Sequence, residues 1–351
     1  MTTDINFMKR CLELARLGAG QVAPNPMVGC VVVHNGKIVG EGFHEKYGEA
    51  HAEVNAIRSV ENQKLLNEST LYVTLEPCAH HGKTPPCSDL IVSKKIPKVV
   101  IGTIDPFAEV AGKGIEKMKR AGIDISLGIL ENECCELNKR FFTFHQKKRP
   151  YIFLKWAQTE DGFIDIDRSV EYFGEPTWIT GPEALLRVHQ MRAEENAIMV
   201  GTNTAEKDNP TLTVRHCKGT NPLRIVLDRN LRLSADLKIF NAESDTIIIN
   251  AVKNEKRATL EFIRVDYSKN ILPQIMDILY HKEKLSLIVE GGRNLLQRFI
   301  DSGLWDEAHV YTGKKKFNKG IQAPEIKISP QQREEIGSDV LEIFRNPDQG
   351  L

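Results

Sequence analysis

Apolar and polar positions along the 351-residue chain alternate in short blocks that are typical of a mixed α/β protein. Asp4 can cap a first helix, because apolar positions recur at helical spacing from Phe7 to Ala15. Apolar runs at 28–33 and 37–40 then flank Asn35-Gly36, a dipeptide that favours a tight hairpin turn.

The blocks that follow the hairpin predict strands alternating with helices. In the first half, we expect strands at 71–75, 99–104 and 123–128, helices opening at His51 and at Pro77-Cys78, and further helices at 88–95, 114–121 and 131–144. In the second half, we expect strands at 151–157, 197–200, 223–227, 246–250 and 285–289, with helices opening at Gly181 and spanning 271–281 and 295–302. This alternation predicts the α/β class, with helices on both faces of the first sheet.

One segment interrupts the pattern near the middle of the chain. Lys147-Lys148-Arg149-Pro150 combines a charge run with a residue that stops helices. We therefore predict a linker there and two domains, 1–146 and 147–351, each of ordinary domain size. A tight surface turn is the alternative interpretation of this segment.

A constellation of metal-binding residue types lies where two of these elements begin. The chain has His51-Ala52-Glu53, then Pro77-Cys78, then Cys87, a stretched form of the signature H-x-E…P-C-x-x-C of zinc-dependent nucleobase deaminases. One imidazole and two thiolates suit Zn²⁺ and leave a fourth position for water. Zinc lowers the pKa of that water, and Glu53 is placed to carry a proton to a departing amine.

Other interpretations of this stretch are a structural zinc site closed by His80 or His81, or two unrelated cysteines. Gly82-Lys83-Thr84 resembles the end of a phosphate-binding P-loop, but such a loop needs a glycine where Pro77 stands. We therefore exclude a nucleoside triphosphate site.

Composition indicates which kinds of binding partner the protein has. The chain carries 47 basic and 47 acidic residues, a balance that favours a small substrate over nucleic acid. No apolar run is long enough to span a bilayer, and the polar start shows no secretory pattern. Seven cysteines do not form a disulfide framework, so we expect a cytoplasmic enzyme without membrane or nucleic-acid partners.

Glycines follow two predicted strands in the second half, at Gly201 and at Gly291-Gly292. Such turns let backbone N–H groups approach a phosphate, although simple tight turns explain the glycines equally well. The dinucleotide fingerprint G-x-G-x-x-G is absent, which argues against a Rossmann site.

With these residues in place, the whole chain resembles the bifunctional riboflavin-biosynthesis deaminase–reductases. The resemblance in the first half is carried by Asn25-Pro26-Met27-Val28-Gly29, Gly42-Phe43-His44, His51-Ala52-Glu53 and the stretch from Glu76-Pro77-Cys78 to Cys87. It implies a cytidine-deaminase-like α/β/α sandwich that deaminates a phosphorylated pyrimidine, with zinc on His51, Cys78 and Cys87 and Glu53 as proton shuttle. It also implies substrate contacts at Asn25, His44, His80, Lys83 and Thr84.

The second half resembles the dihydrofolate-reductase-like domain of the same family. The resemblance is carried by Lys155 to Gly162, Trp178-Ile179-Thr180, Arg192, Asp208-Asn209-Pro210, Thr213-Val214-Arg215 and Glu290-Gly291-Gly292. It implies an NADPH-dependent reduction that opens a ribosylamino group to a ribityl chain. Asp208 would handle a proton or grip the substrate, and Arg192 and Arg215 would hold the phosphate.

The remaining residues that the resemblance implies divide between substrate and cofactor. Trp178 and Glu290 would contact the substrate, and Lys155, Thr180, Gly201, Thr202, Thr204, Gly291 and Gly292 would contact NADPH. The chain departs from the family pattern at Phe107, at Thr159-Glu160 and at Pro176. The departure at Phe107 concerns a polar contact of the deaminase half, whereas those at Thr159-Glu160 and Pro176 motivate the alternative of a deaminase whose C-terminal half does not reduce. A nucleic-acid deaminase and a non-enzymatic zinc protein are further alternatives, and a homo-oligomer, dimer or tetramer, is also expected.

Overall fold

The computed structural model describes residues 2–79, 85–107 and 111–350. It divides the chain into two compact units, which meet in the sequence between Lys148 and Arg149. Each unit is described by itself below. Among the described residues, no helix has the length and apolar character needed to cross a membrane.

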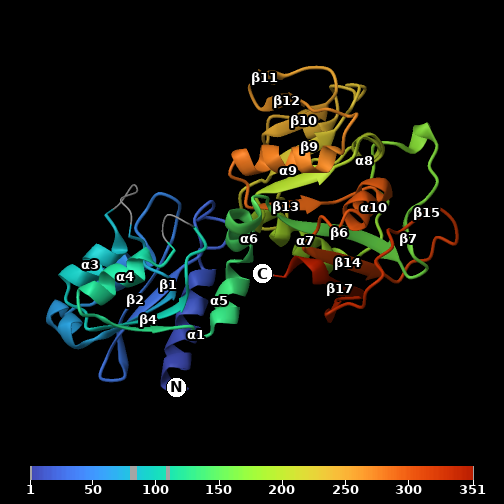
Figure 1. Cartoon of the computed structure of the whole chain (residues 1–351). Helices are drawn as coiled ribbons and strands as arrows, with labels where there is room; N and C mark the ends of the chain where they lie inside the picture. Colours follow the sequence, from blue (N-terminus) through green and yellow to red (C-terminus); the bar gives the residue numbers. More distant parts are fainter. Residues whose placement is uncertain (1, 80–84, 108–110, 351) are drawn as a thin grey trace. The chain divides into compact units, whose positions relative to one another are not determined.

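The N-terminal unit is built on a five-stranded sheet in the order β2-β1-β3-β4-β5 (Figure 1). Its strands are β1 (Gly29–His34), β2 (Lys37–Phe43), β3 (Thr70–Leu75), β4 (Lys98–Thr103) and β5 (Asp124–Leu127), and its helices are α1 (Thr2–Arg16), α2 (Ala52–Ser59), α3 (Cys87–Ser93), α4 (Lys113–Arg120), α5 (Glu131–Leu137) and α6 (Lys139–Lys147). The strands β1 and β2 form the predicted hairpin, and β3, β4 and β5 run parallel.

Alternation along the strands sends apolar side chains to both faces of this sheet. Cys30 and Val32 of β1 pack with α2, α3 and α4, whereas Val31 and Val33 pack with α1 and α5. The prediction of a sheet covered by helices on both faces is therefore confirmed.

Two helix boundaries in this unit differ from the prediction. Residues 77–79 are not helical, since the Glu76 N–H bonds the carbonyl of Thr103, the last residue of β4, and the chain continues without regular structure to Ala79; residues 80–84 lie outside the described residues. The helix α3 begins instead at Cys87, with Pro86 as its N-cap. The predicted helix 131–144 is two helices, α5 and α6, which are separated at Asn138. The backbone leaves helical geometry there, and the Asn138 side chain bonds the N–H and the carbonyl of Met27, each at 2.8 Å.

The C-terminal unit contains a ten-stranded sheet in the order β11-β12-β10-β9-β8-β13-β6-β14-β17-β16. Its strands are β6 (Tyr151–Thr159), β8 (Ala197–Val200), β9 (Leu223–Leu227), β10 (Thr246–Asn250), β11 (Glu255–Arg257), β12 (Leu260–Arg264), β13 (Ser286–Val289), β14 (Glu307–Gly313), β16 (Gln332–Ile336) and β17 (Asp339–Arg345). The helices are α7 (Pro182–Glu194), α8 (Thr202–Asp208), α9 (Ile271–His281) and α10 (Arg293–Asp301), and a separate pair of short strands is formed by β7 (Phe163–Asp165) and β15 (Ile321–Gln322).

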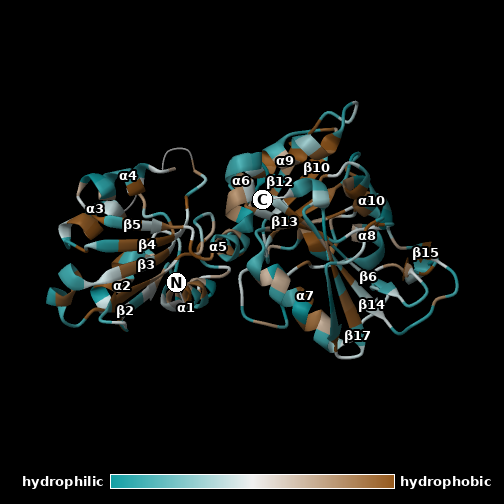
Figure 2. Cartoon of the chain, turned by 60° about the horizontal axis from the view of Figure 1, so that its bottom comes forward, coloured by the Kyte–Doolittle hydropathy of each residue, from teal (hydrophilic) through white to brown (hydrophobic). Residues whose placement is uncertain are grey.

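The strands from β12 to β14 run parallel, and β11, β17 and β16 pair antiparallel at the two sides. One face of the sheet packs on α9 and α10, and the other on α7 and α8. Figure 2 shows hydrophobic colouring along the strands of both units. Since β8 and β13 are parallel neighbours, Gly201 and Gly291 meet at the same edge, where the Gly201 N–H bonds the Gly291 carbonyl at 2.9 Å.

Candidate active sites

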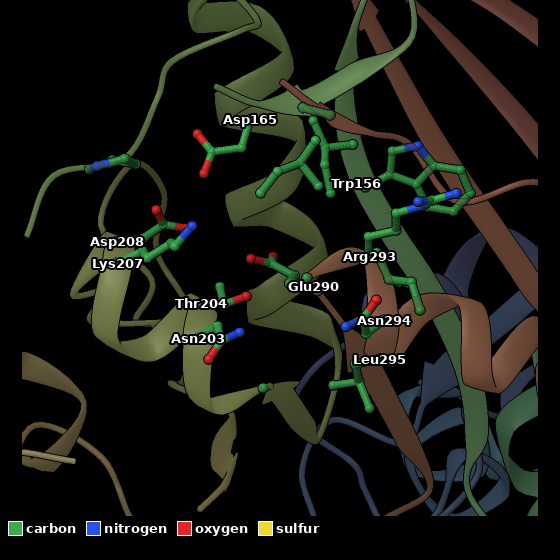
Figure 3. A pocket seen from close by; sticks show the side chains of 18 of the residues that line it. Trp156, Asp165, Asn203, Thr204, Lys207, Asp208, Glu290, Arg293, Asn294 and Leu295 are labelled. Carbon is green, nitrogen blue, oxygen red and sulfur yellow. The ribbon is translucent and has the colours of Figure 1, made fainter. Parts of the chain in front are cut away.

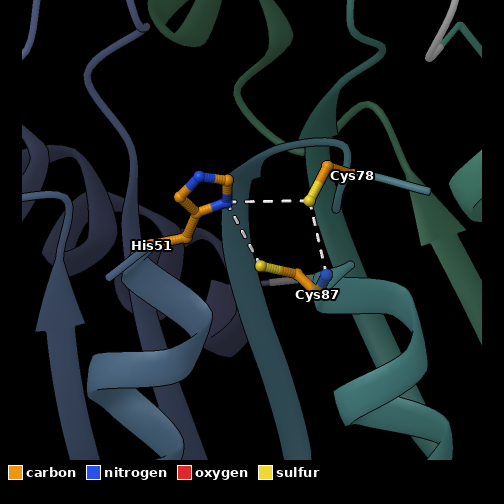
Figure 4. A group of neighbouring side chains, drawn as sticks. All are labelled: His51, Cys78 and Cys87. Atoms are coloured by element: carbon orange, nitrogen blue, oxygen red, sulfur yellow. Dashed lines mark hydrogen bonds between the residues drawn. The ribbon is translucent and has the colours of Figure 1, made fainter. Parts of the chain in front are cut away.

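The three predicted zinc ligands converge in the N-terminal unit (Figure 4). His51 is the N-cap of α2, Cys78 follows β3, and Cys87 is the first residue of α3. His51 Nδ1 lies 3.6 Å from Cys78 Sγ and 3.4 Å from Cys87 Sγ. A tetrahedral zinc ion with ordinary bond lengths separates nitrogen from sulfur by roughly 3.5 Å, so this cluster fits the metal.

Hydrogen bonds favour ionisation of one of the two thiols, Cys78. The Cys87 side chain, His51 and the Cys87 N–H at 3.3 Å all donate toward Cys78 Sγ, and together they lower the pKa of Cys78 to about 4. The hydrogen bond that Cys87 donates to Cys78, together with burial, raises the pKa of Cys87. A metal would remove this asymmetry, because it binds both sulfurs as thiolates.

Glu53 lies in the first turn of α2, directly beyond the ligands. Its side chain is buried, and burial together with the Cys78 charge raises the pKa of this carboxyl to about 7. Glu53 also hydrogen-bonds Cys87. A carboxyl at this position can hold or release a proton beside the fourth position of the metal.

Asn25 and His44 form a hydrogen-bonded pair beside the metal ligands. Asn25 Nδ2 lies 3.1 Å from His44 Nε2, and His44 Nδ1 lies 3.1 Å from the Ala50 carbonyl. Since a carbonyl can only accept, His44 donates from Nδ1 and accepts from Asn25 at Nε2. The His44 and His51 rings meet edge to face with centroids 5.4 Å apart. His80, Lys83 and Thr84 lie outside the described residues.

Glu76 and Asp105 are buried acids of this region for which sequence reasoning assigned no role. The Glu76 carboxylate accepts from the backbone N–H groups of Gly112 and Gly114 at 2.9 Å, Ile115 at 3.2 Å and Asp105 at 3.4 Å. Burial, Glu76 and Cys78 raise the pKa of Asp105 to about 7. The only sequence signal for either was its neighbourhood, directly before Pro77-Cys78 or before Pro106-Phe107.

The C-terminal unit holds a cavity of about 510 Å³ at the ends of β6, β8 and β13 (Figure 3). Its lining includes eight of the residues implied by the family resemblance: Lys155, Gly201, Thr202, Thr204, Asp208, Glu290, Gly291 and Gly292. As the described residues define it, the lining does not include Arg192, Arg215, Trp178 or Thr180.

The two glycine turns lie together at this cavity. Gly201 is the N-cap of α8 and Gly292 that of α10, and the peptide bond between Gly291 and Gly292 is cis. Gly291 has a φ of 121°, which favours glycine. A Cβ on Gly292 would lie 3.2 Å from Thr204 Oγ1, so a side chain there would crowd the cavity. The glycine cradle therefore suits the phosphates of a dinucleotide.

Two residues of the lining, Glu290 and Lys155, form a charge cluster with Arg192, which does not itself line the cavity. Arg192 and Glu290 form a bidentate ion pair, in which Arg192 Nη2 lies 2.7 Å from Glu290 Oε2 and Arg192 Nε lies 3.2 Å from Glu290 Oε1. Burial alone would raise the pKa of Glu290, but the charges of Arg192 and Lys155 outweigh it and lower that pKa to about 2. Burial also lowers the pKa of the Lys155 ammonium group.

Arg215 lies at the surface near this cluster rather than inside it. Its backbone N–H donates to His189 Nδ1 at 3.0 Å, and its guanidinium bonds the Thr211 hydroxyl. Trp178 is 54% exposed and its carbonyl accepts from Lys315. Thr180 is partly buried.

Asp208 ends α8 and belongs to a network that sequence reasoning missed. Arg168 Nη2 donates to Asp208 at 2.5 Å and to Asp165 at 2.7 Å. The Thr177 hydroxyl, next to Pro176, donates to Asp165 at 2.8 Å. All of these residues line the cavity, and no known motif marks Asp165 or Arg168.

Comparisons with known proteins match both halves of the chain. The model of the cytidine and deoxycytidylate deaminase zinc-binding region matches residues 1–103, and the model of the RibD C-terminal domain matches residues 150–315. The riboflavin biosynthesis protein RibD of Aquifex aeolicus is 39% identical to this chain, with 97% of this chain and 98% of that protein covered. RibD of Escherichia coli K12 is 35% identical, with 89% and 88% covered.

Solved structures also match nearly the whole chain. A structure from Thermotoga maritima, described as a diaminohydroxyphosphoribosylaminopyrimidine deaminase/5-amino-6-(5-phosphoribosylamino)uracil reductase, is 38% identical and has a TM-score of 0.88. The match covers 98% of this chain and 99% of that one. Acinetobacter baumannii RibD is 30% identical with a TM-score of 0.87.

These findings confirm the predicted fold class, the two enzyme activities and the two cofactors, Zn²⁺ and NADPH. They do not favour the alternative of a deaminase with an inert second domain, because both halves match. The chain belongs to the RibD family of bifunctional riboflavin-biosynthesis deaminase–reductases.

Proposed function

We propose that this chain deaminates 2,5-diamino-6-(5-phosphoribosylamino)pyrimidin-4(3H)-one by hydrolysis and then reduces the ribosyl chain of the product to ribityl with NADPH. Residues 1–146 would carry the first reaction and residues 147–351 the second. The observation that carries the proposal is the pair of sites: a His/Cys/Cys cluster beside a buried Glu53, and a glycine-cradled cavity that holds Lys155, Asp208 and Glu290.

In the deaminase site, His51, Cys78 and Cys87 would hold the metal. Zinc supplies, when bound, Lewis acidity toward a water molecule. Glu53 takes a proton from the attacking water and delivers it to the amine that leaves as ammonia. The hydrogen bond from Asn25 fixes the His44 ring beside His51, so both side chains can contact the substrate. His80, Lys83 and Thr84 complete the proposed substrate contacts.

In the reductase site, NADPH supplies the hydride when bound. Gly201, Thr202, Thr204, Gly291 and Gly292 would receive its phosphates, with Lys155 near the nicotinamide and Thr180 as a further contact. The hydride goes to C1 of the ribosylamino group, the bond from C1 to the ring oxygen breaks, and Asp208 supplies the proton that the ring oxygen takes up.

Arg215 and Arg192 lie in different surroundings, so we assign them different roles in binding the substrate. Arg215 is exposed, so its guanidinium can meet the substrate phosphate. Arg192 is held by Glu290, so it would act through Glu290, which lines the cavity and would orient the pyrimidine. Trp178, with its exposed ring, would close over the substrate from outside.

Two variants separate the activities. We expect Cys78→Ala to lose zinc and deamination while still oxidising NADPH when it is given the already deaminated ribotide. Asp208→Asn should deaminate normally and fail in reduction. If either variant lost both activities while remaining folded, the assignment of one reaction to each unit would be wrong.

Two further features support finer proposals. The free thiol state of all seven cysteines fits a reducing compartment, so we propose the cytoplasm. Val170, Tyr172 and Trp178 expose 77%, 67% and 54% of their surface within one segment, which supports a homo-oligomer, dimer or tetramer. Light scattering of the purified protein tests the latter.

A further inference from the structure

Arg168 lies between two carboxylates at the reductase cavity. Its side chain is 6% exposed, and one nitrogen, Nη2, reaches Asp208 Oδ1 at 2.5 Å and Asp165 Oδ2 at 2.7 Å. The other terminal nitrogen, Nη1, donates to the Glu175 carbonyl at 2.5 Å. Figure 3 shows Asp165 and Asp208 in the group of side chains that line this cavity.

The same contacts tie an irregular segment to the end of α8. Asp165 also accepts from the Thr177 hydroxyl at 2.8 Å, and the Gly174 N–H bonds the Lys207 carbonyl at 2.8 Å. Residues 165–177 are therefore attached to the turn of α8 that carries Asp208. Arg168 bonds both Asp165 and Asp208 and so lies between the two carboxylates in this attachment.

The charges around Asp208 explain why this cation matters. Burial and the nearby Asp165 carboxylate both raise the pKa of Asp208, whereas Arg168 and Lys207 lower it. Two partly buried carboxylates without a cation between them would repel each other and share a proton. They would also repel the anionic cofactor that the cavity takes up.

We propose that Arg168 is a positioning residue of the reductase: it holds the Asp208 carboxyl at the cavity and balances its charge against that of Asp165. This inference rests on the proposed role of Asp208 in proton transfer. Arg168 acts through Asp208 and need not touch the substrate.

The test is the pH dependence of NADPH oxidation with the deaminated ribotide. In Arg168→Gln, Asp208 should keep its proton to higher pH, so the limb of the pH profile that Asp208 controls should move up by about one to three pH units. Arg168→Lys keeps a positive charge and should move that limb less. The KM for NADPH should rise in Arg168→Gln and recover in Arg168→Lys.

Two controls exclude a merely structural effect. Arg232 bonds Glu206 of α8, the helix that carries Asp208, at 2.9 Å and does not line the cavity. Arg232→Gln should therefore leave the reductase pH profile unchanged. Deamination by the same preparations reports whether the first unit is folded and loaded with zinc, and thermal unfolding of each variant beside the wild type reports whether the second unit is folded.

A double variant decides whether Arg168 acts through Asp208. We expect Arg168→Gln combined with Asp208→Asn to be no slower than Asp208→Asn alone. The inference is overturned if Asp208→Asn is impaired while Arg168→Gln matches wild type, or if Arg168→Gln is slow with an unchanged pH profile and adds fully to Asp208→Asn. If Asp208→Asn alone reduces normally, the proposed role of Asp208 fails as well, and the two failures are told apart by that single variant.

Discussion

At the scale of single residues, Glu53 has the most sharply defined environment. It is buried in the first turn of α2 beside Cys87 and Cys78, and it is not one of the three converging ligands. Glu53→Gln keeps the shape and removes the ability to carry a proton. We expect deamination to fall by about 10²–10⁴-fold with zinc content unchanged, measured by ammonia release and metal analysis.

Reduction by the same preparation is the internal control for Glu53→Gln. A variant that deaminates at the wild-type rate would refute the proton-shuttle role. A variant that also loses its zinc would instead show that Glu53 supports the metal site.

His189 illustrates a residue whose charge state is fixed by its surroundings. Burial and the nearby charges of Arg192 and Arg215 lower its pKa to about 4, and its Nδ1 accepts from the Arg215 N–H. In the unfolded chain the pKa of histidine is about 6.5. The contribution of His189 to stability is therefore fully present above pH 6.5 and is lost as the pH falls from 6.5 toward 4, because the unfolded chain takes up the proton first.

His189→Asn removes this titration and retains an oxygen that can accept from Arg215. We expect its urea-unfolding midpoint to depend less on pH between 7 and 5 than that of the wild type. An identical pH dependence in the two proteins would show that His189 does not contribute this effect.

At the scale of elements, Glu76 connects β3 to the start of α4. Its carboxylate accepts four backbone N–H groups, and Gly114 lies so close that a Cβ there would be 2.0 Å from the Pro77 carbonyl oxygen. This contact holds Pro77-Cys78 in its extended path beside α4.

Glu76→Ala should leave those buried N–H groups without partners, at about 1–3 kcal/mol for each one that finds no other acceptor. We expect weaker zinc binding and slower deamination, with reduction unaffected. Glu76→Gln keeps one acceptor oxygen and should recover part of the loss. Normal zinc affinity in Glu76→Ala, measured by competition with a chelator, would contradict this account.

The helices and strands also show how much secondary structure the spacing of apolar residues can predict. Regular β-α alternation predicted the five strands of the first unit and, in the second unit, β6, β8, β9, β10 and β13, because buried parallel strands are continuously apolar. The break at Asn138 was not visible, since it depends on a contact with Met27, over one hundred residues away in the sequence. The other strands of the second unit, β7, β11, β12, β14, β15, β16 and β17, were missed. For β16 the reason is plain, because its sequence, Gln-Arg-Glu-Glu-Ile, is mostly exposed at the side of the sheet and has no apolar run.

The same distinction applies to the candidate sites. His51, Cys78 and Cys87 are marked by local motifs, whereas Asp165 and Arg168 acquire meaning only when folding brings them to Asp208. The chemistry of a metal site restricts the residue types allowed, so it can be read from the sequence. An arginine between two aspartates occurs throughout protein surfaces and carries no such signal.

At the scale of the whole molecule, two units with separate hydrophobic cores carry separate chemistry. The described zinc ligands all belong to the first unit and the described cavity to the second. Removing zinc with a chelator should therefore abolish deamination and leave NADPH oxidation with the deaminated ribotide intact. Parallel loss of both activities, restored by added zinc, would show that the second unit also depends on the metal.

The most direct test of the central claim is one incubation of the zinc-loaded protein with the diaminopyrimidinone ribotide, with and without NADPH, followed by mass spectrometry. We predict replacement of one amino group by oxygen in both samples, and addition of two hydrogens only in the sample with NADPH. Deamination without reduction would contradict the reductase assignment, and no change in either sample would contradict the proposed substrate.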